Sequence, residues 1–248
     1  GRAGVAALLL ASLSCNRDVR PTPAAGPAVE ATLFFTSELK GYLGPCGCSE
    51  NMRGGIDRAA FQLDLARQGG RPVLLLDTGD ALFAERSLAD EAVAQQERKA
   101  QALAQAFRLM GLSGRFTGAL DDARGPAFRV GLGLPELASD TLHLLDVKGH
   151  KVALFSARQA EALAALSLKA RAAKASVVIG LFEGPFDEAL RLSSGDALAI
   201  DLLLATRGRD ELSTEENRLV MGRVPVVQVQ SKGRSLLRVD LTLRDATP

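Results

Sequence analysis

Two segments of the 248-residue chain carry side chains that suit catalysis or metal binding. Residues 77–80 read Asp-Thr-Gly-Asp and directly follow the apolar run 73–76. An acidic residue on a glycine turn after a buried strand can point its carboxylate at a metal ion or a phosphate, and it can equally cap the turn or the next helix. Histidine is scarce, because only His143 and His150 are present. A metal site made from three histidines of one chain is therefore excluded.

The second segment is the loop 37–48, in which Cys46 and Cys48 flank a single glycine. A disulfide between cysteines two positions apart closes a small, strained ring, which is easier to reduce than an ordinary disulfide. Three interpretations are open: a structural disulfide that stiffens the loop, a redox-active pair, or two metal ligands completed by carboxylates or by another chain.

Apolar runs of strand length alternate with segments of helical periodicity, and they place both segments at strand ends. The pattern predicts strands at 32–36, 73–76, 141–147, 151–155, 176–182, 200–205, 224–229 and 235–243, and helices at 55–68, 88–110, 159–174 and 185–192. The last two strands are expected to pair with each other across residues 231–234. This order indicates an α/β layered fold with a mixed sheet or two sheets, in which ligands bind beyond the carboxyl ends of the strands.

The composition limits the class of protein. Hydrophobic residues make up 47% of the chain and charged residues 24%, which is typical of a globular protein. The 30 lysines and arginines are balanced by 29 acidic residues, and no block of basic residues stands out. Binding to nucleic acid is therefore not expected.

The first thirty residues predict a targeting signal followed by a tether. Residues 1–15 hold an apolar run and end in Cys15 after small residues, which resembles the cleavage site of a bacterial lipoprotein signal whose start is missing. Ser12 stands where leucine is usual, so a plain secretory signal or a buried N-terminal helix is the alternative. Residues 16–30 carry three prolines and predict a linker, and 31–248 are expected to form the domain. We expect an exported protein of the periplasm or outer envelope, held at the membrane by a lipid on Cys15.

Four segments resemble the 5′-nucleotidase-like branch of the calcineurin-type metallophosphoesterases. Residues 36–43 resemble its Thr-Asn-Asp-Leu-His-Gly opening, 54–60 its Gly-Gly-Leu-Ala-Arg-Arg segment, 74–83 its second strand with the Gly-Asp motif, and 225–241 its closing hairpin. The Pro-Cys-Gly-Cys at 45–48 resembles a lipoprotein-like subset of these proteins. The resemblance extends over 31–244 and implies a four-layer αββα sandwich with mixed sheets and a two-metal site at the sheet edge.

The metal ligands that this resemblance implies are mostly replaced. Glu38 and Lys40 stand where it places an aspartate and a histidine, whereas Asp80 keeps the position of the aspartate that bridges both metals. A lysine ammonium has no lone pair to donate to a metal and repels a cation. The Asn-His pair is replaced by Ala119 and Leu120.

The remaining histidine ligands are also absent from the loops where they are expected. Residues 182–184 read Phe-Glu-Gly and 205–208 read Ala-Thr-Arg-Gly. His143 and His150 fall in the predicted hairpin, away from these loops, and we interpret them as surface or strand residues. Glu183 and Asp187 are interpreted as solvated or helix-start charges.

These replacements predict an exported, lipid-anchored protein with a metallophosphoesterase fold that is catalytically degenerate and acts in binding or in an envelope-associated role. Glu38 and Asp80 are then a vestigial metal site; no cofactor is assigned, and divalent metal is not expected at full occupancy. The partner, whether a protein or a small molecule, is not identified by the sequence. Two alternatives are a thiol–disulfide redox protein that uses Cys46 and Cys48, and a phosphoester hydrolase with an altered metal site at Glu38 and Asp80.

Overall fold

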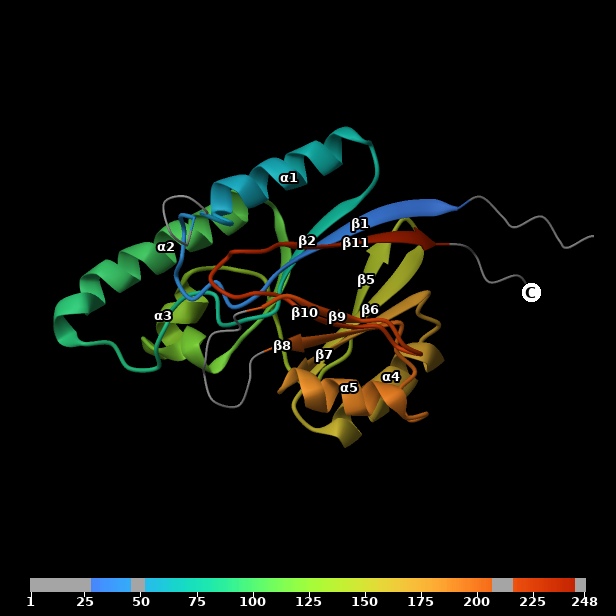
Figure 1. Cartoon of the computed structure of the whole chain (residues 1–248). Coiled ribbons are helices and arrows are strands. Elements are labelled where there is room, and N and C mark those ends of the chain that lie inside the picture. Colours follow the sequence, from blue (N-terminus) through green and yellow to red (C-terminus); the bar gives the residue numbers. More distant parts are fainter. Residues whose placement is uncertain (1–27, 46–51, 207–215, 244–248) are drawn as a thin grey trace, which may run out of the picture.

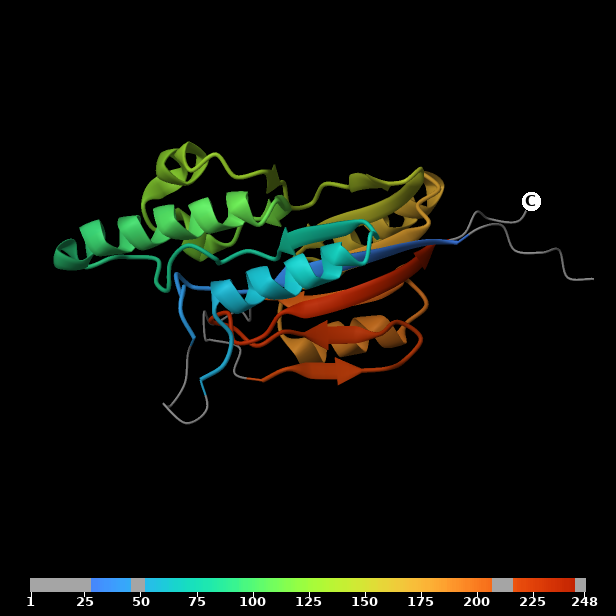
Figure 2. The ribbon, with the colours of Figure 1, turned by 90° about the horizontal axis from the view of Figure 1, so that it is seen from above.

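Two β-sheets pack face to face, with helices on both outer sides (Figures 1 and 2). The computed structural model describes residues 28–45, 52–206 and 216–243. The first sheet has the strand order β11-β1-β2-β3-β4, with bounds Leu237–Leu243, Val29–Thr36, Val73–Asp77, Leu112–Phe116 and Glu136–Leu137. The second sheet has the order β5-β6-β7-β8-β10-β9, with bounds His143–Val147, His150–Ala157, Val177–Glu183, Leu202–Thr206, Val226–Gln228 and Arg218–Val220.

Side-chain alternation along the strands produces the layers. In β1, Leu33 and Phe35 point into the core between the sheets, whereas Phe34 points outward against the helices. Helices α1 (Ile56–Gln68) and α2 (Val93–Leu109) cover the outer face of the first sheet, and α4 (Ala160–Ala172) and α5 (Phe186–Ser194) cover the second (Figure 1). Successive side chains of a strand face opposite ways, so a strand buried on both faces is apolar throughout. The predicted four-layer αββα sandwich is confirmed.

Most predicted elements are present, with shifted ends. The helix predicted at 88–110 begins only at Val93, after a 3₁₀ turn over Asp90–Ala92. Strands β3, β4 and β9 and helix α3 (Gly125–Gly131) were not predicted from the sequence. The sequence of β3, Leu-Ser-Gly-Arg-Phe, lacks the apolar run that marks the other inner strands, because Ser113, Gly114 and the buried Arg115 interrupt it.

The predicted pairing of the last two strands is wrong. β10 lies in the second sheet, where it pairs with β8 and β9, and β11 crosses to the first sheet and pairs antiparallel with β1. The edge of β1 offers seven paired positions from Val29↔Leu243 to Phe35↔Leu237, whereas β10 is only three residues long. The longer ladder satisfies more backbone hydrogen bonds, so β11 completes the first sheet.

The parallel order of β1, β2 and β3 brings the loops that follow them to one edge of the first sheet.

β1 begins at Val29, so its first two residues fall inside the range predicted as a linker. Among the described residues, no helix is both long enough and apolar enough to cross a membrane.

Candidate functional site

The loops after β1 and β2 run side by side and hold each other through their backbones. The N–H of Glu38 donates to Gly79 O at 3.1 Å and the N–H of Lys40 donates to Asp80 O at 3.0 Å. Glu38, Lys40 and Asp80 all have left-handed backbone conformations, with φ of 47°, 50° and 53°. Each such conformation costs a non-glycine residue about 1–3 kcal/mol, and such strain clusters at functional sites. The backbone here therefore keeps the shape of a site.

A buried ion pair lies in the loop after β1. Lys40 Nζ is 3.8 Å from Glu38 Oε2, and the two side chains are only 4% and 2% exposed. These are the two residues that the sequence places at metal-ligand positions. The structure therefore brings together a carboxylate and a fixed positive charge where a metal ion would need two electron-pair donors.

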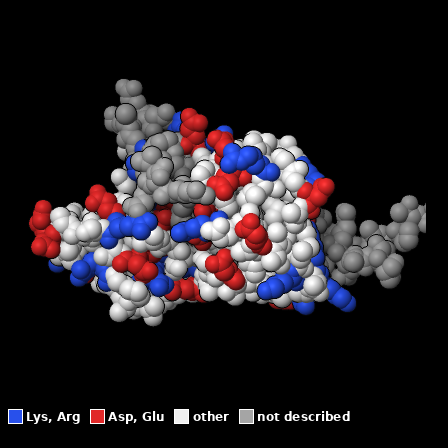
Figure 3. Space-filling view, turned by 90° about the horizontal axis from the view of Figure 1, so that it is seen from below, with Lys and Arg blue, Asp and Glu red and all other residues white. Residues whose placement is uncertain are grey.

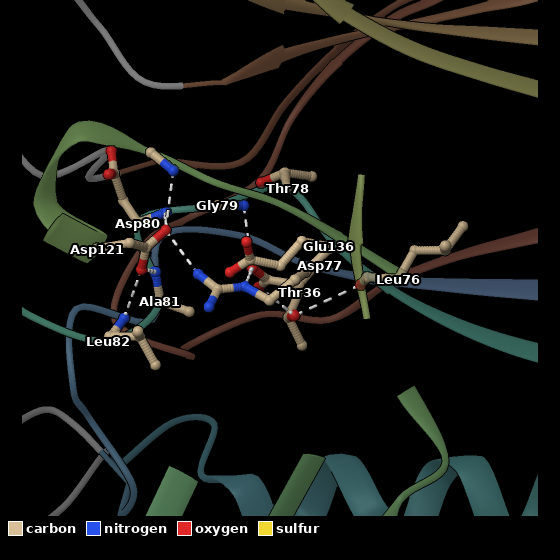
Figure 4. A network of polar contacts seen from close by, with 12 residues as sticks. Thr36, Leu76, Asp77, Thr78, Gly79, Asp80, Ala81, Leu82, Asp121 and Glu136 are labelled. Carbon is tan, nitrogen blue, oxygen red and sulfur yellow. Dashed lines mark hydrogen bonds and ion pairs between the residues drawn. The ribbon is translucent and has the colours of Figure 1, made fainter. Parts of the chain in front are cut away.

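Asp121 fills a ring of backbone N–H groups beneath the loop after β2 (Figure 4). Its carboxylate accepts hydrogen bonds from Asp80, Ala81 and Leu82, each at 2.9 Å, and from Gly118 at 2.8 Å. Converging backbone N–H groups form a nest that binds anions, and here the anion belongs to the chain itself. Both carboxylate oxygens of Asp121 are thereby engaged.

Arg115 supplies the positive charge beside that nest. It is fully buried on β3, with Nη2 2.6 Å from Asp121 Oδ2 and Nε 4.0 Å from Asp77 Oδ1. None of its guanidinium nitrogens has hydrogen-bond geometry to a partner within the described residues. Charge attraction, rather than aligned hydrogen bonds, therefore links Arg115 to the end of β2 and to the 3₁₀ turn after β3. No sequence pattern points to this residue, because β3 itself was not predicted.

Asp77 caps its own turn at the end of β2. It accepts hydrogen bonds from the Thr36 hydroxyl at 2.6 Å and from the Gly79 N–H at 3.0 Å. Burial raises the pKa of the Asp77 carboxyl to about 6; Arg115 and the two hydrogen bonds oppose this rise, and Asp121 adds to it. Capping, one of the two roles expected from the sequence, is what Asp77 performs.

Asp80 lies where β2 and the segment after β3 approach most closely. It is 6% exposed, and its Oδ1 accepts a hydrogen bond from the Leu120 N–H at 2.9 Å. A Cβ added to Gly118 would lie 1.8 Å from this oxygen, so a larger residue there would have to displace Asp80. One oxygen of the predicted bridging ligand is thus already engaged with the backbone.

The donor set does not fit a two-metal centre. A metal bound to Glu38 at an ordinary oxygen distance would lie within roughly 6 Å of the Lys40 ammonium, which would repel it. Asp121 is occupied by four N–H groups. Within the described residues, no three His, Cys, Asp or Glu side chains gather as a metal-binding group.

At the corresponding edge of the second sheet, the described charged residues include Glu183, Asp187 and Arg158. Glu183, at the end of β7, accepts hydrogen bonds from Ser156 at 2.5 Å and Ser139 at 3.0 Å, and its side chain is 9% exposed. The interpretation of Glu183 as a solvated charge is therefore wrong, because two serine hydroxyls hold it against the sheet. Asp187 is exposed in the first turn of α5, as expected, and pairs with Arg218 at 2.8 Å.

The remaining predicted residues lie elsewhere or outside the described chain. His143 and His150 are strand residues in β5 and β6; His143 Nε2 lies 2.9 Å from Ala138 O. Cys15, Cys46 and Cys48 lie outside the described residues. On the face drawn in Figure 3, basic and acidic side chains are intermixed.

Comparison with solved structures identifies the fold. The calcineurin-like phosphoesterase YfkN from Bacillus subtilis superposes with a TM-score of 0.65 at 15% identity, over 89% of this chain and 87% of that one. The NAD nucleotidase from Haemophilus influenzae gives 0.65 at 13% identity, over 89% and 49% of the two chains. The 5′-nucleotidase precursor from Thermus thermophilus gives 0.64 at 14%, over 87% and 55%. The chain thus spans about half the length of these nucleotidases. Neither a protein family model nor a curated protein sequence matches it.

Proposed function

Because the chain has the fold of the 5′-nucleotidase-like calcineurin-type metallophosphoesterases, we propose that it is a catalytically degenerate protein of that fold which acts by binding. The observation that carries the proposal is the buried pair of Lys40 and Glu38, 3.8 Å apart, at the positions of two metal ligands. Two-metal hydrolysis needs metal ions to clamp the attacking and leaving oxygens and to generate hydroxide near neutral pH. A fixed ammonium does neither.

The surrounding contacts support the same proposal. The nest of N–H groups around Asp121 and the Leu120 N–H on Asp80 are satisfied by the chain's own carboxylates. A group that is already hydrogen-bonded and charge-paired would have to break those contacts to ligate a metal. The loops therefore keep their backbone geometry while their side chains are committed to one another.

Metal loading tests the proposal. The protein is incubated with Mn²⁺ or Zn²⁺ and desalted, its metal content is measured by elemental analysis, and hydrolysis of bis(p-nitrophenyl) phosphate is followed. We expect well under one metal ion per chain and no hydrolysis that Asp80→Ala removes. One or more bound metal ions together with an activity lost in Asp80→Ala would establish the altered-site hydrolase instead.

A second variant examines the role of the ammonium directly. Lys40→His replaces the charge with an imidazole that can ligate, so bound Mn²⁺ or Zn²⁺ should rise above the wild-type level. Lys169→His, on the exposed side of α4, is the matched control and should leave metal content unchanged. Equal metal content in wild type and Lys40→His would show that the ammonium is not what keeps metal away.

We further propose that the protein is exported and anchored by a lipid on Cys15. The support is the apolar run that precedes Cys15 and the proline-containing segment that follows it. Expression of the full precursor in a bacterium and mass spectrometry of the mature N-terminus should find an acylated Cys15. Cys15→Ser should release the protein from the membrane fraction, and an unmodified, uncleaved Cys15 would contradict the anchor.

A further inference from the structure

A cavity opens beside the carboxyl end of β1, with Thr36 and Leu39 in its lining. It has a volume of about 130 Å³ and is open on one side. Three segments far apart in the sequence form it: the end of β1 and its loop, the first turn of α1, and the turn before β11. Its lining residues are Thr36, Leu39, Tyr42, Gly54, Gly55, Ile56, Arg58, Ala59, Gln62, Gly233, Arg234, Ser235 and Leu236.

Glycines explain why this space is not filled by side chains. Gly54 and Gly233 both have positive φ, and a Cβ on Gly54 would lie 1.7 Å from Gly233 O. The Gly55 N–H donates to the same carbonyl oxygen at 3.2 Å. Two turns therefore meet backbone to backbone, and this contact fixes the wall of the cavity without side chains to occupy it.

The walls and the rim of the cavity differ in chemistry. Leu39, Ile56, Ala59 and Leu236 provide apolar walls, and Arg58 and Arg234 provide positive charge. None of the lining residues, all of which are described, is acidic. The nearest acid on α1, Asp57, is exposed and does not line the space.

The first turn of α1 and Tyr42 complete the wall. Gly55, Ile56, Arg58 and Ala59 line the cavity from the start of α1, where the N–H groups of Gly55 and Ile56 donate to Gly233 O and Leu43 O and Asp57 is the acidic residue of the turn. Tyr42 lies at the cavity with the ammonium groups of Lys99 and Lys232 each 5.8 Å from its ring centre. The cavity thus combines an apolar body with an anion-attracting rim.

We propose that this cavity binds a small organic anion, with an apolar part about the size of a benzene ring and one carboxylate or phosphate group. A cavity of about 150 Å³ accepts benzene, so a volume of about 130 Å³ suits one ring or a short branched chain. Guanidinium groups bind carboxylate and phosphate through charge-assisted hydrogen bonds. The site is independent of whether metals bind at Glu38 and Asp80, because none of its lining residues belongs to that set.

A titration with matched probes tests the site. The full chain, labelled with ¹⁵N, is titrated with benzoate, phenyl phosphate, benzyl alcohol and inorganic phosphate, and its backbone amide shifts are followed. We expect saturable shifts at Gly54, Ile56 and Gly233 with benzoate or phenyl phosphate, and at least about tenfold weaker binding of the neutral alcohol and of inorganic phosphate. The tighter of the two anions identifies the preferred head group.

Variants then assign the binding to the cavity. Arg58→Gln and Arg234→Gln should each weaken the better anion by about fivefold or more, and Ala59→Leu, which fills the space, should abolish binding. Arg71→Gln, on an arginine that pairs with Glu30 and Asp240 away from the cavity, should change nothing.

Several results would overturn the site. One is the absence of saturation by either anion up to about 10 mM, and another is equal affinity for benzyl alcohol. A third is unchanged binding in both arginine variants. Because both arginines are at least partly exposed, these two variants keep the test decisive if Ala59→Leu fails to fold.

Discussion

The carboxyl edges of the two sheets differ in how their charged side chains are buried and paired. At the carboxyl edge of the first sheet, Glu38, Lys40, Asp77, Asp80, Arg115 and Asp121 are all less than 7% exposed and are held by one another or by the backbone. At the same edge of the second sheet, in the part that the structure describes, Asp187 and Arg158 have largely exposed side chains and Glu183 is held close to the sheet. Buried charges are costly unless they are paired, so the contacts at the first edge depend on one another, whereas those at the second edge do not.

The difference shows which of the two edges is held together by its own contacts. The first edge keeps strained loops and a filled nest of N–H groups, so its backbone is preserved by internal contacts. The described part of the second edge has fewer such supports, namely the left-handed Asp140 with φ of 54° and the hydrogen-bonded Glu183, and the buried hydroxyl of Thr206 has no hydrogen-bond partner there. The stability of the protein is therefore expected to be far more sensitive to mutation at the first edge.

The largest effect is expected for Asp121→Ala. This change removes the nearest negative charge from Arg115 and leaves four N–H groups without their acceptor. Removal of one partner from a buried pair costs about 3–5 kcal/mol, which should appear as a loss of unfolding free energy in urea titration. The matched change at the second edge, Asp187→Ala, breaks an exposed pair and should cost at most about 1 kcal/mol. Similar losses of unfolding free energy in Asp121→Ala and Asp187→Ala would show that the two edges do not differ in this way.

The next effect depends on pH and concerns Asp77. Its pKa is raised to about 6 from an ordinary value of 3.8, so the folded protein binds this proton at a higher pH than the unfolded chain. The resulting stabilisation is complete below about pH 4 and is lost as pH rises through 6, a change of about 3 kcal/mol. Asp77→Asn carries no proton to lose, so the unfolding free energy of wild type relative to the variant should fall by about that amount between pH 4 and 8.

The control for this pH effect is Gly131→Ala, which changes no titratable group and should therefore follow wild type at every pH. Urea titrations of all three proteins at several pH values provide the comparison. If the difference in unfolding free energy between wild type and Asp77→Asn stayed constant from pH 4 to 8, the Asp77 carboxyl would titrate alike in the folded and unfolded chains.

The smallest effect is expected for Gly118→Ala. The added methyl group would meet Asp80 Oδ1 at 1.8 Å, so the loops must separate slightly. Overpacking of this kind costs about 1–3 kcal/mol. At Gly131, in α3, no atom lies within 4 Å of an added Cβ, so Gly131→Ala should be neutral or slightly stabilising in thermal unfolding. A neutral Gly118→Ala would mean that the two loops are not tightly joined.

The sequence predicts the inner strands and the site loops because those features are local. Apolar runs identify β1, β2 and β7, and the motifs place Glu38, Lys40 and Asp80 at strand ends. The nest around Asp121 was not predictable, because its donors are backbone N–H groups that every residue carries and that only the folded chain brings together. The pairing of β11 with β1 was missed for a related reason. The strand at 224–229 is the neighbour in sequence and so was expected to be the partner, whereas the number of residues that β11 pairs with β1 depends on how the whole sheet is assembled.

The closure of β1 by β11 also sets the order of folding. The Thr32 hydroxyl donates to Asp240 at 2.6 Å across a separation of 208 residues. Contacts over such long separations form slowly, since much of the chain must first be ordered. Until β11 docks, one edge of β1 exposes N–H and C=O groups that can pair with another chain. The interval between synthesis of β1 and docking of β11 is therefore the period in which this edge is open to pairing with another chain.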